Sequence, residues 1–420
     1  YNRQNGALKL ADDLFDRYTI RNKVSYRPFK WLTLGNNTYL TNTKRETPTY
    51  FDIWTIYNFF PTYYDKNPDG SWANSPVGRL GSQLTNGGVT EDRYSSFQTQ
   101  FTNELSFFDK VFKINTDFTF RRGNYDYNYY TNKYLIGYGP EDIREEGTNY
   151  AYRRSTNEDY YVLNIYGTYN QEFGPHAITA IGGFNQEYYR WSRFYADRNM
   201  VISASLPTIA LATGEDNVGE SITSWALRGA FYRLNYIFQD KYIIEFNGRY
   251  DGSSKFPQDK RFGFFPSYSA SWILDREAFM AGILGPISLL KLRASYGSLG
   301  NQAVSSDFGY ISTMNASNSN YLIGGERPLR VGAPPSVSSN YTWEEVTTLN
   351  FGVDLGLFDD KVLTSFDIYD RDTKGMLTQG RELPAVFGTG EPAENAADLE
   401  TKGWELSISY RDNIQLGSKP

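Results

Sequence analysis

The chain has 420 residues, of which 40% are hydrophobic and 17% aromatic, and its formal net charge is −6. The acidic balance argues against a nucleic-acid partner, and the absence of Cys excludes disulfide bonds and thiolate metal sites. No apolar run is long enough for a membrane helix, so this chain would have to cross a membrane as a closed β-barrel.

From the first residues onward, segments in which apolar and polar residues alternate are joined by connections of two lengths. Alternation with period two is typical of β-strands. Short turns and long polar segments follow one another, which gives roughly fourteen strands in one unit over 1–420. The long segments, which we predict to be extracellular loops, cover about 41–91, 123–157, 190–223, 251–261, 298–343 and 374–402.

The strand predicted over 242–251 has one apolar face and one charged face. Full charges deep in a strand are unusual for a soluble sheet, whereas a membrane barrel has an apolar lipid face and a polar lumen. We therefore predict an all-β fold, an antiparallel transmembrane β-barrel whose short turns carry an aromatic girdle. The apolar face holds Tyr242, Ile244, Phe246, Gly248 and Tyr250, and the other holds Glu245, Asn247, Arg249 and Asp251.

The patterns that could mark metal or catalytic sites are weak. Asp65, Asn67 and Asp69 match the first half of a calcium loop, but Pro76 stands where the bidentate Glu belongs. His176 is the one His, which cannot make a zinc site of the usual type, and we predict a solvated turn residue. Paired carboxylates lie near strand ends, where charge favours water. We predict no enzyme activity, no catalytic residue, no metal and no cofactor.

The segment 41–91 is too aromatic for simple disorder. Two explanations remain open: these rings stack on a ligand or a partner protein, or they pack within their own loop. The candidates for contact with a substrate or a covering protein are Trp54, Tyr57, Phe59, Phe60, Tyr63, Tyr64 and Trp72.

Two motifs around the strand at 242–251 resemble SusC/RagA-type TonB-dependent outer-membrane transporters. They are RYDGSSKF at 249–256 and RFGFFPS at 261–267, and later stretches at 290–302, 343–354, 369–374 and 395–406 follow in the family's order. The resemblance covers most of the chain. Its motif residues are Arg249, Tyr250, Asp251, Gly252, Phe264, Phe265 and Pro266.

The resemblance implies a 22-stranded barrel with a plugged lumen, of which this chain holds an interior portion without the plug. It also implies the outer membrane as the location, with outer-membrane lipid around the barrel. The implied partners are a SusD-like surface lipoprotein and the TonB–ExbB–ExbD complex, the latter acting through parts outside this sequence. The implied ligand is usually an oligosaccharide and less often a peptide.

Other functions fit parts of the pattern. A passive porin would lack the plug, and a soluble all-β glycan-binding protein or glycosidase would stay in solution without detergent. A surface receptor for a toxin or for adhesion would use the same loops without import. No sequence rule names the substrate or the loop residues that bind it.

Overall fold

The computed structural model describes residues 1–50, 53–282, 285–304, 306–412 and 417. Within these described residues, fourteen strands form one antiparallel sheet, and they follow one another across the sheet in the order of the chain. They are β1 (Asn2–Asn5), β2 (Leu14–Phe29), β3 (Leu32–Pro48), β4 (Gly88–Phe107), β5 (Phe112–Thr131), β8 (Tyr150–Phe173), β9 (His176–Asn199), β10 (Asn217–Phe238), β11 (Tyr242–Ser253), β12 (Phe262–Ile273), β13 (Ile287–Asn301), β16 (Glu344–Leu357), β17 (Val362–Gln379) and β18 (Ala393–Tyr410).

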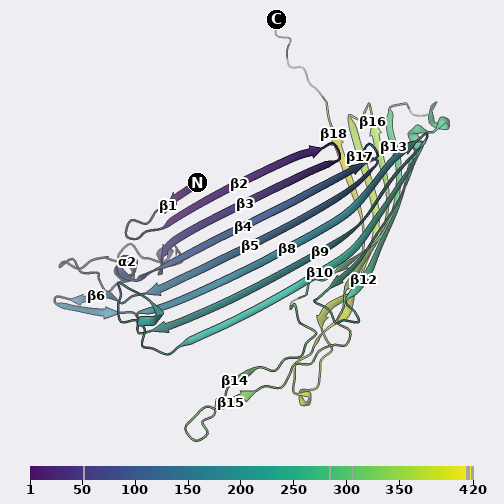
Figure 1. The fold of residues 1–420 in the computed structure, drawn as a ribbon. Helices are drawn as coiled ribbons and strands as arrows, with labels where there is room; N and C mark the ends of the chain where they lie inside the picture. Colours follow the sequence, from purple (N-terminus) through teal and green to yellow (C-terminus); the bar gives the residue numbers. More distant parts are fainter. Residues whose placement is uncertain (51–52, 283–284, 305, 413–416, 418–420) are drawn as a thin grey trace.

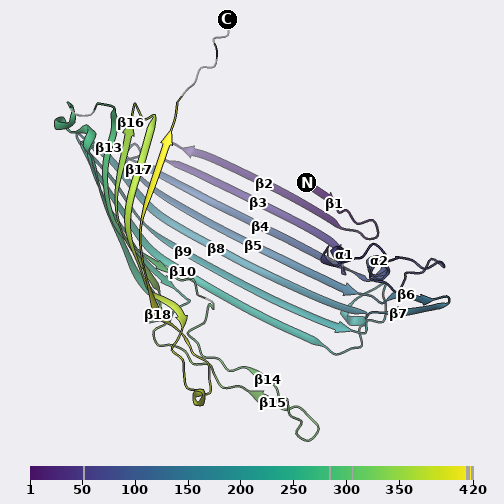
Figure 2. The same cartoon turned by 180° about the vertical axis from the view of Figure 1, so that it is seen from behind.

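The sheet is strongly curved, with β2 to β10 in one broad wall and β13 to β18 turned away from it (Figures 1 and 2). The barrel is not closed, and β1 and β18 form the two edges. No helix in the described ranges is long and apolar enough to cross a membrane. All-β architecture, as predicted, is confirmed.

The connections differ sharply between the two ends of the sheet. At the short-turn end the strands are joined by tight turns, or by the 3-10 turns Leu274–Arg276 and Ala278–Met280 between β12 and β13. At the long-loop end the connections carry their own elements (Figure 1). These are α1 (Ile53–Tyr57), α2 (Pro76–Asn86), the hairpin β6 (Tyr134–Gly139) and β7 (Asp142–Glu146), and the hairpin β14 (Ala316–Asn318) and β15 (Leu329–Val331).

Several strands run further than the sequence pattern predicted. β5 continues to Thr131 and β8 begins at Tyr150, and with β6 and β7 between them most of the predicted loop 123–157 is strand. β9 likewise reaches Asn199, and β10 begins at Asn217. These extensions mix tyrosine with Asn, Asp, Arg and Ser, which resembles a loop in composition, but their residues keep the period of two. The short strand β1 was not predicted from the sequence, because its four residues are all polar and show no alternation.

The strands keep two distinct faces around the sheet. Pairing between β3 and β12 proceeds without a register shift, so side chains of one parity stay on one face. The apolar set that includes Phe246 faces lipid, and we call it the outer face. The opposite set, which includes Glu245 and Arg293, is the inner face.

The aromatic girdle lies at the short-turn end of the outer face. Tyr242 stacks on Phe238 at 6.2 Å and on Trp272 at 6.1 Å between ring centroids. His176 belongs to the same belt: it lies 5.0 Å from Phe238, and its Nδ1 is 2.7 Å from the hydroxyl of Tyr236. The prediction of a solvated turn residue was therefore wrong, because His176 opens β9 and is half-buried among rings.

Candidate ligand-binding wall

The inner face at the long-loop end of β5, β8 and β9 is a continuous aromatic surface. Outer-face residues at this height are mostly polar, among them Asp126, Asn128 and Arg153, so the strands here extend beyond the lipid-facing band. We call the surface the tyrosine wall. It consists of Tyr125, Tyr127 and Tyr129 on β5, Tyr150, Tyr152 and Arg154 on β8, and Trp191, Arg193 and Tyr195 on β9.

The rings of the wall contact one another across three strands. Tyr127 and Tyr129 stack with centroids 6.4 Å apart, and the edge of Tyr152 meets Tyr127 at 5.8 Å. Tyr152 in turn stacks on Tyr195 at 6.0 Å, and Tyr150 meets Tyr129 at 5.8 Å. This packing restrains the rings in advance, which lowers the entropy lost when a ligand stacks on them.

Two arginines lie over these rings. The guanidinium of Arg154 lies 4.7 Å from the Tyr127 centroid and 5.3 Å from that of Tyr125. Arg193 lies 5.5 Å from Trp191 and 5.8 Å from Tyr195. In both, the Nε atom is buried and has no hydrogen-bond acceptor. Among the described residues neither arginine forms an ion pair with a carboxylate.

The acidic groups near the wall already have donors. Asp92 accepts a hydrogen bond from the hydroxyl of Tyr125. Asp197 accepts one from Asn217 Nδ2 at 2.8 Å. The wall therefore combines rings for stacking with cations whose donor capacity is not filled by a protein carboxylate. Such a surface can hold a polar solute that presents both a flat face and oxygen acceptors.

The predicted aromatic candidates of the β3–β4 connection divide into two groups. Trp54 meets Tyr57 edge to face at 6.2 Å, and Phe60 meets Tyr63 at 5.4 Å. Tyr57 is 81% exposed, and Trp54, Phe60 and Tyr64 are also exposed. Tyr63 and Phe59 are half-buried. Whether these rings contact a substrate or a lid stays a prediction.

Trp72 differs from the other candidates because it packs inside its own loop. A Cβ added at Gly81 of α2 would lie 2.3 Å from its ring, so glycine makes room for the indole. Lys66 covers the ring at 4.7 Å. Trp72 thus holds α2 in position, which agrees with the second of the two explanations for this segment.

The calcium-like motif folds as a turn. The Asp69 carboxylate accepts from the backbone N–H of Ser71 at 2.9 Å and from its hydroxyl, and these hydrogen bonds hold the pKa of Asp69 below its usual range. Asn67 donates to the carbonyl of Gly137 at 3.0 Å. Pro76 is the first residue of α2, which Ser75 caps. The motif residues therefore connect the loop to β6.

The family-motif residues anchor the long loops. Phe265 packs against Trp343 with centroids 5.4 Å apart, and Trp343 also contacts Phe256 at 5.1 Å. Phe256 is 0% exposed, and Tyr341 covers it at 6.0 Å. Trp343 Nε1 donates to the carbonyl of Arg261 at 2.9 Å. This cluster binds the β11–β12 connection to the start of β16.

The remaining motif residues shape β11 and β12. Arg249 forms a two-point ion pair with Asp251, with distances of 2.8 and 2.9 Å. Gly252 leaves space for the ring of Phe262, to which a Cβ would lie at 2.3 Å. On the outer face Tyr250 stacks on Phe262 at 5.3 Å. The outer-face Phe264 is paired with Tyr250, and Pro266 is paired with Gly248.

The tyrosine wall escaped the sequence reasoning because its residues fell in segments predicted to be loops. A signal was present in the spacing, since Tyr125, Tyr127 and Tyr129 alternate with polar residues. Trp191, Arg193 and Tyr195 repeat the same spacing. Alternation of this kind indicates strand even where both faces are wet.

Residues 11–418 match the family model described as TonB dependent receptor-like, beta-barrel. The chain belongs to the TonB-dependent receptor family. It is 29% identical over 370 residues to TonB-dependent receptor P3 of Formosa agariphila, covering 86% of this chain and 35% of that protein. It is 28% identical over 318 residues to SusC of Bacteroides thetaiotaomicron, covering 75% and 27%.

The fold agrees with the RagAB peptide importer in its closed-closed state. The TM-score is 0.77 at 18% identity, over 99% of this chain and 46% of that chain. The SusC/RagA-type resemblance predicted from the motifs is confirmed, and so are the outer-membrane location and the multi-pass barrel. The family comprises receptors and transporters rather than enzymes. The chain spans 35% of the length of TonB-dependent receptor P3 and 27% of that of SusC, so it covers only a part of these relatives.

Proposed function

We propose that this receptor imports a polar nutrient, an oligosaccharide first and a peptide second, across the outer membrane. The tyrosine wall carries the proposal. Its rings offer stacking faces, and Arg154 and Arg193 offer donors to ligand oxygens. The ligand is bound and moved without chemical change. The long-loop end is extracellular in this proposal, since outer-membrane barrels have short periplasmic turns and longer outer loops.

The energy for import comes from TonB–ExbB–ExbD, acting through parts of the receptor outside these residues. Binding at the wall concentrates the ligand at the mouth of the barrel before it is moved. Between two aromatic rings, stacking contributes about 0.5–1.5 kcal/mol beyond area burial, and we take contributions of this order for a ligand face that stacks on a tyrosine. Several rings together therefore give useful affinity while leaving release possible.

A SusD-like lipoprotein covers the long-loop end in the same proposal. Support comes from the exposed apolar side chains that gather there, which a partner would shield from water. Tyr57 on α1 and Tyr321, Leu322 and Ile323 beyond β14 are among the most exposed large side chains of the chain. The RagAB peptide importer shares the fold of this chain, and its name describes that protein alone. The shared fold is compatible with a covering partner here.

The test uses the full-length receptor in its native host. Tyr127→Ala with Tyr152→Ala should reduce ligand affinity and uptake at least about tenfold, because two stacking faces worth about 1.4 kcal/mol together are lost. Tyr250→Ala, on the outer face, is the matched control and should leave uptake unchanged. Normal uptake in the double variant, with normal receptor abundance, would contradict the wall as the ligand surface.

A passive porin is one rival. Deleting TonB separates the two, because a porin continues to pass the solute and an active importer does not. A soluble glycan-binding protein is set aside because the chain belongs to an outer-membrane family. Adhesion or toxin reception without import is tested by deleting the receptor. In that case the deletion would abolish binding of the ligand at the cell surface but would leave its uptake unchanged.

A further inference from the structure

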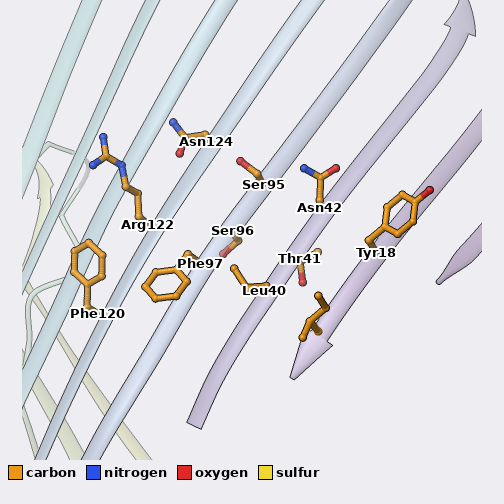
Figure 3. Close-up of a pocket in the computed structure, with 11 residues that line it drawn as sticks. Tyr18, Leu40, Thr41, Asn42, Ser95, Ser96, Phe97, Phe120, Arg122 and Asn124 are labelled. Atoms are coloured by element: carbon orange, nitrogen blue, oxygen red, sulfur yellow. The ribbon is translucent and has the colours of Figure 1, made fainter. Parts of the chain in front are cut away.

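A pocket of about 300 Å³ opens on the outer face across β2, β3, β4 and β5. Figure 3 shows its side chains projecting from four neighbouring strands, with Asn124, Ser95 and Asn42 toward one end and Phe120, Phe97 and Leu40 toward the other. The polar end is nearer the long loops. Since this face turns toward lipid, the pocket is separate from the tyrosine wall on the inner face.

The register arranges the pocket in two rows. Ile20, Leu40 and Phe97 lie side by side and form an apolar floor, and Arg122 completes that row. The next row toward the long loops is Tyr18, Asn42, Ser95 and Asn124. An apolar floor beneath a cation and amides matches an amphiphile with a chain and a polar head.

The guanidinium of Arg122 has N–H donors that could bind a ligand. Its side chain is 57% exposed, and its Nε lies 3.7 Å from Asp159, which is longer than a hydrogen bond. Above the pocket Lys44 and Arg93 on the same face are already paired with Glu91, at 3.0 and 2.9 Å. Among the described residues that line the pocket, Arg122 is therefore a cation held only by one loose ion pair, and it can still donate to an anion.

At the end of the pocket away from the long loops, the polar side chains already have hydrogen-bond partners within the protein. Thr38 and Thr99 share a hydrogen bond of 2.9 Å, and Asn36 donates to Thr99 at 3.0 Å. These polar groups satisfy one another on a face that has no water in the bilayer. A ligand thus meets its polar partners at the Arg122 end alone.

We propose that this pocket binds one anionic membrane lipid, with its phosphate on Arg122 and an acyl chain across Ile20, Leu40 and Phe97. A charge-assisted contact between guanidinium and phosphate gives the headgroup preference. A neutral headgroup would leave the arginine with only its loose ion pair to Asp159, 3.7 Å away, at the edge of a low-dielectric layer. The proposal does not depend on what the receptor imports.

The test is lipid binding to delipidated full-length receptor in detergent, measured by native mass spectrometry. Phosphatidylglycerol and phosphatidylcholine with identical chains are the two probes. The anionic lipid should bind one site at least about tenfold more tightly, the ratio that corresponds to about 1.4 kcal/mol. Arg122→Gln should abolish the preference. Leu40→Trp, which fills the floor but keeps the charge, should weaken both lipids at that site.

Arg228→Gln on β10 is the matched control, because it removes the same charge from the outer face away from the pocket and from Asp159. It should keep the preference. Equal binding of the two lipids to the unaltered receptor would overturn the proposal. So would a loss of preference in Arg228→Gln as large as in Arg122→Gln, which would mean general charge attraction. Displacement of phosphatidylglycerol by equimolar inorganic phosphate would exclude a role for the apolar floor.

Discussion

Arginines on the inner face have two opposite kinds of surroundings, one around Arg293 (the first set) and the other around Arg154 and Arg193 (the second set). Arg293 on β13 donates to Asp354 at 2.9 Å through two nitrogens and to Asp367 at 3.0 Å through two contacts. Arg154 and Arg193 in the tyrosine wall lie on rings and reach no carboxylate among the described residues. Arg293 thus has carboxylate partners within the protein, whereas Arg154 and Arg193 can still donate hydrogen bonds to a ligand.

The first set should matter for stability. Arg293→Gln leaves Asp354 and Asp367 close together without their cation, so it should lower the free energy of unfolding by about 2–3 kcal/mol. That is less than for a fully buried pair, since these carboxylates are partly exposed. Thermal unfolding in detergent measures the effect.

Arg293→Lys provides the control for charge alone. A lysine restores the charge but cannot form two-point contacts with both aspartates, so recovery should be partial. An Arg293→Gln receptor as stable as the parent would remove the distinction between the two sets.

The second set should matter for binding and not for stability. Arg154→Gln and Arg193→Gln should each weaken ligand binding by about tenfold to a hundredfold, because a charge-assisted contact is worth about 1.5–3 kcal/mol. The unfolding temperature should stay within a degree or two, since no ion pair is broken. Titration calorimetry and thermal unfolding of the same samples give both values, and a stability loss without a binding loss would reverse the assignment.

A smaller effect is expected at Glu277 in the β12–β13 turn. The hydroxyl of Tyr242, the indole of Trp272 and the ammonium of Lys241 all donate to its carboxylate, at 2.6, 3.0 and 3.1 Å. These contacts lower the pKa of Glu277 to about 2. Its folded pKa is depressed, so its stabilising contribution is full above the ordinary carboxyl range and is lost as the pH falls toward 2.

Glu277→Gln should flatten that part of the pH profile of stability. The measurement is the unfolding temperature between pH 6 and pH 3, compared with Glu141→Gln as a control on an exposed loop. If the unfolding temperature of Glu277→Gln fell with pH as steeply as that of the parent, the contacts of Glu277 would not contribute to the stability of the fold.

Much of the barrel follows from the sequence because lipid and lumen impose opposite demands on alternate residues. The charged face with Glu245 and Arg249 and the apolar face with Phe246 could be separated by period alone. The extent of β5 and β8 could not, because above the lipid both faces meet water and composition there resembles a loop. His176 was misjudged for a related reason, since the rings that cover it come from β8 and β10.

The candidate site was harder to predict than the fold. Spacing of Tyr125, Tyr127 and Tyr129 indicates a strand, but their meeting with Tyr152 and Tyr195 depends on the register between strands. Trp72 was grouped with exposed rings because its packing partner, Gly81, has no side chain to reveal the contact. The motif residues were identified by resemblance, and their packing on Trp343 explains their local role.

The central claim is that the tyrosine wall receives the imported ligand. The most direct measurement is a cryo-electron microscopy structure of the full-length receptor purified from native outer membranes, with mass spectrometry of what accompanies it. Our account predicts a lipoprotein partner and glycan or peptide density stacked on Tyr127, Tyr152 or Tyr195. A lone barrel, or ligand density that avoids the wall, would contradict it.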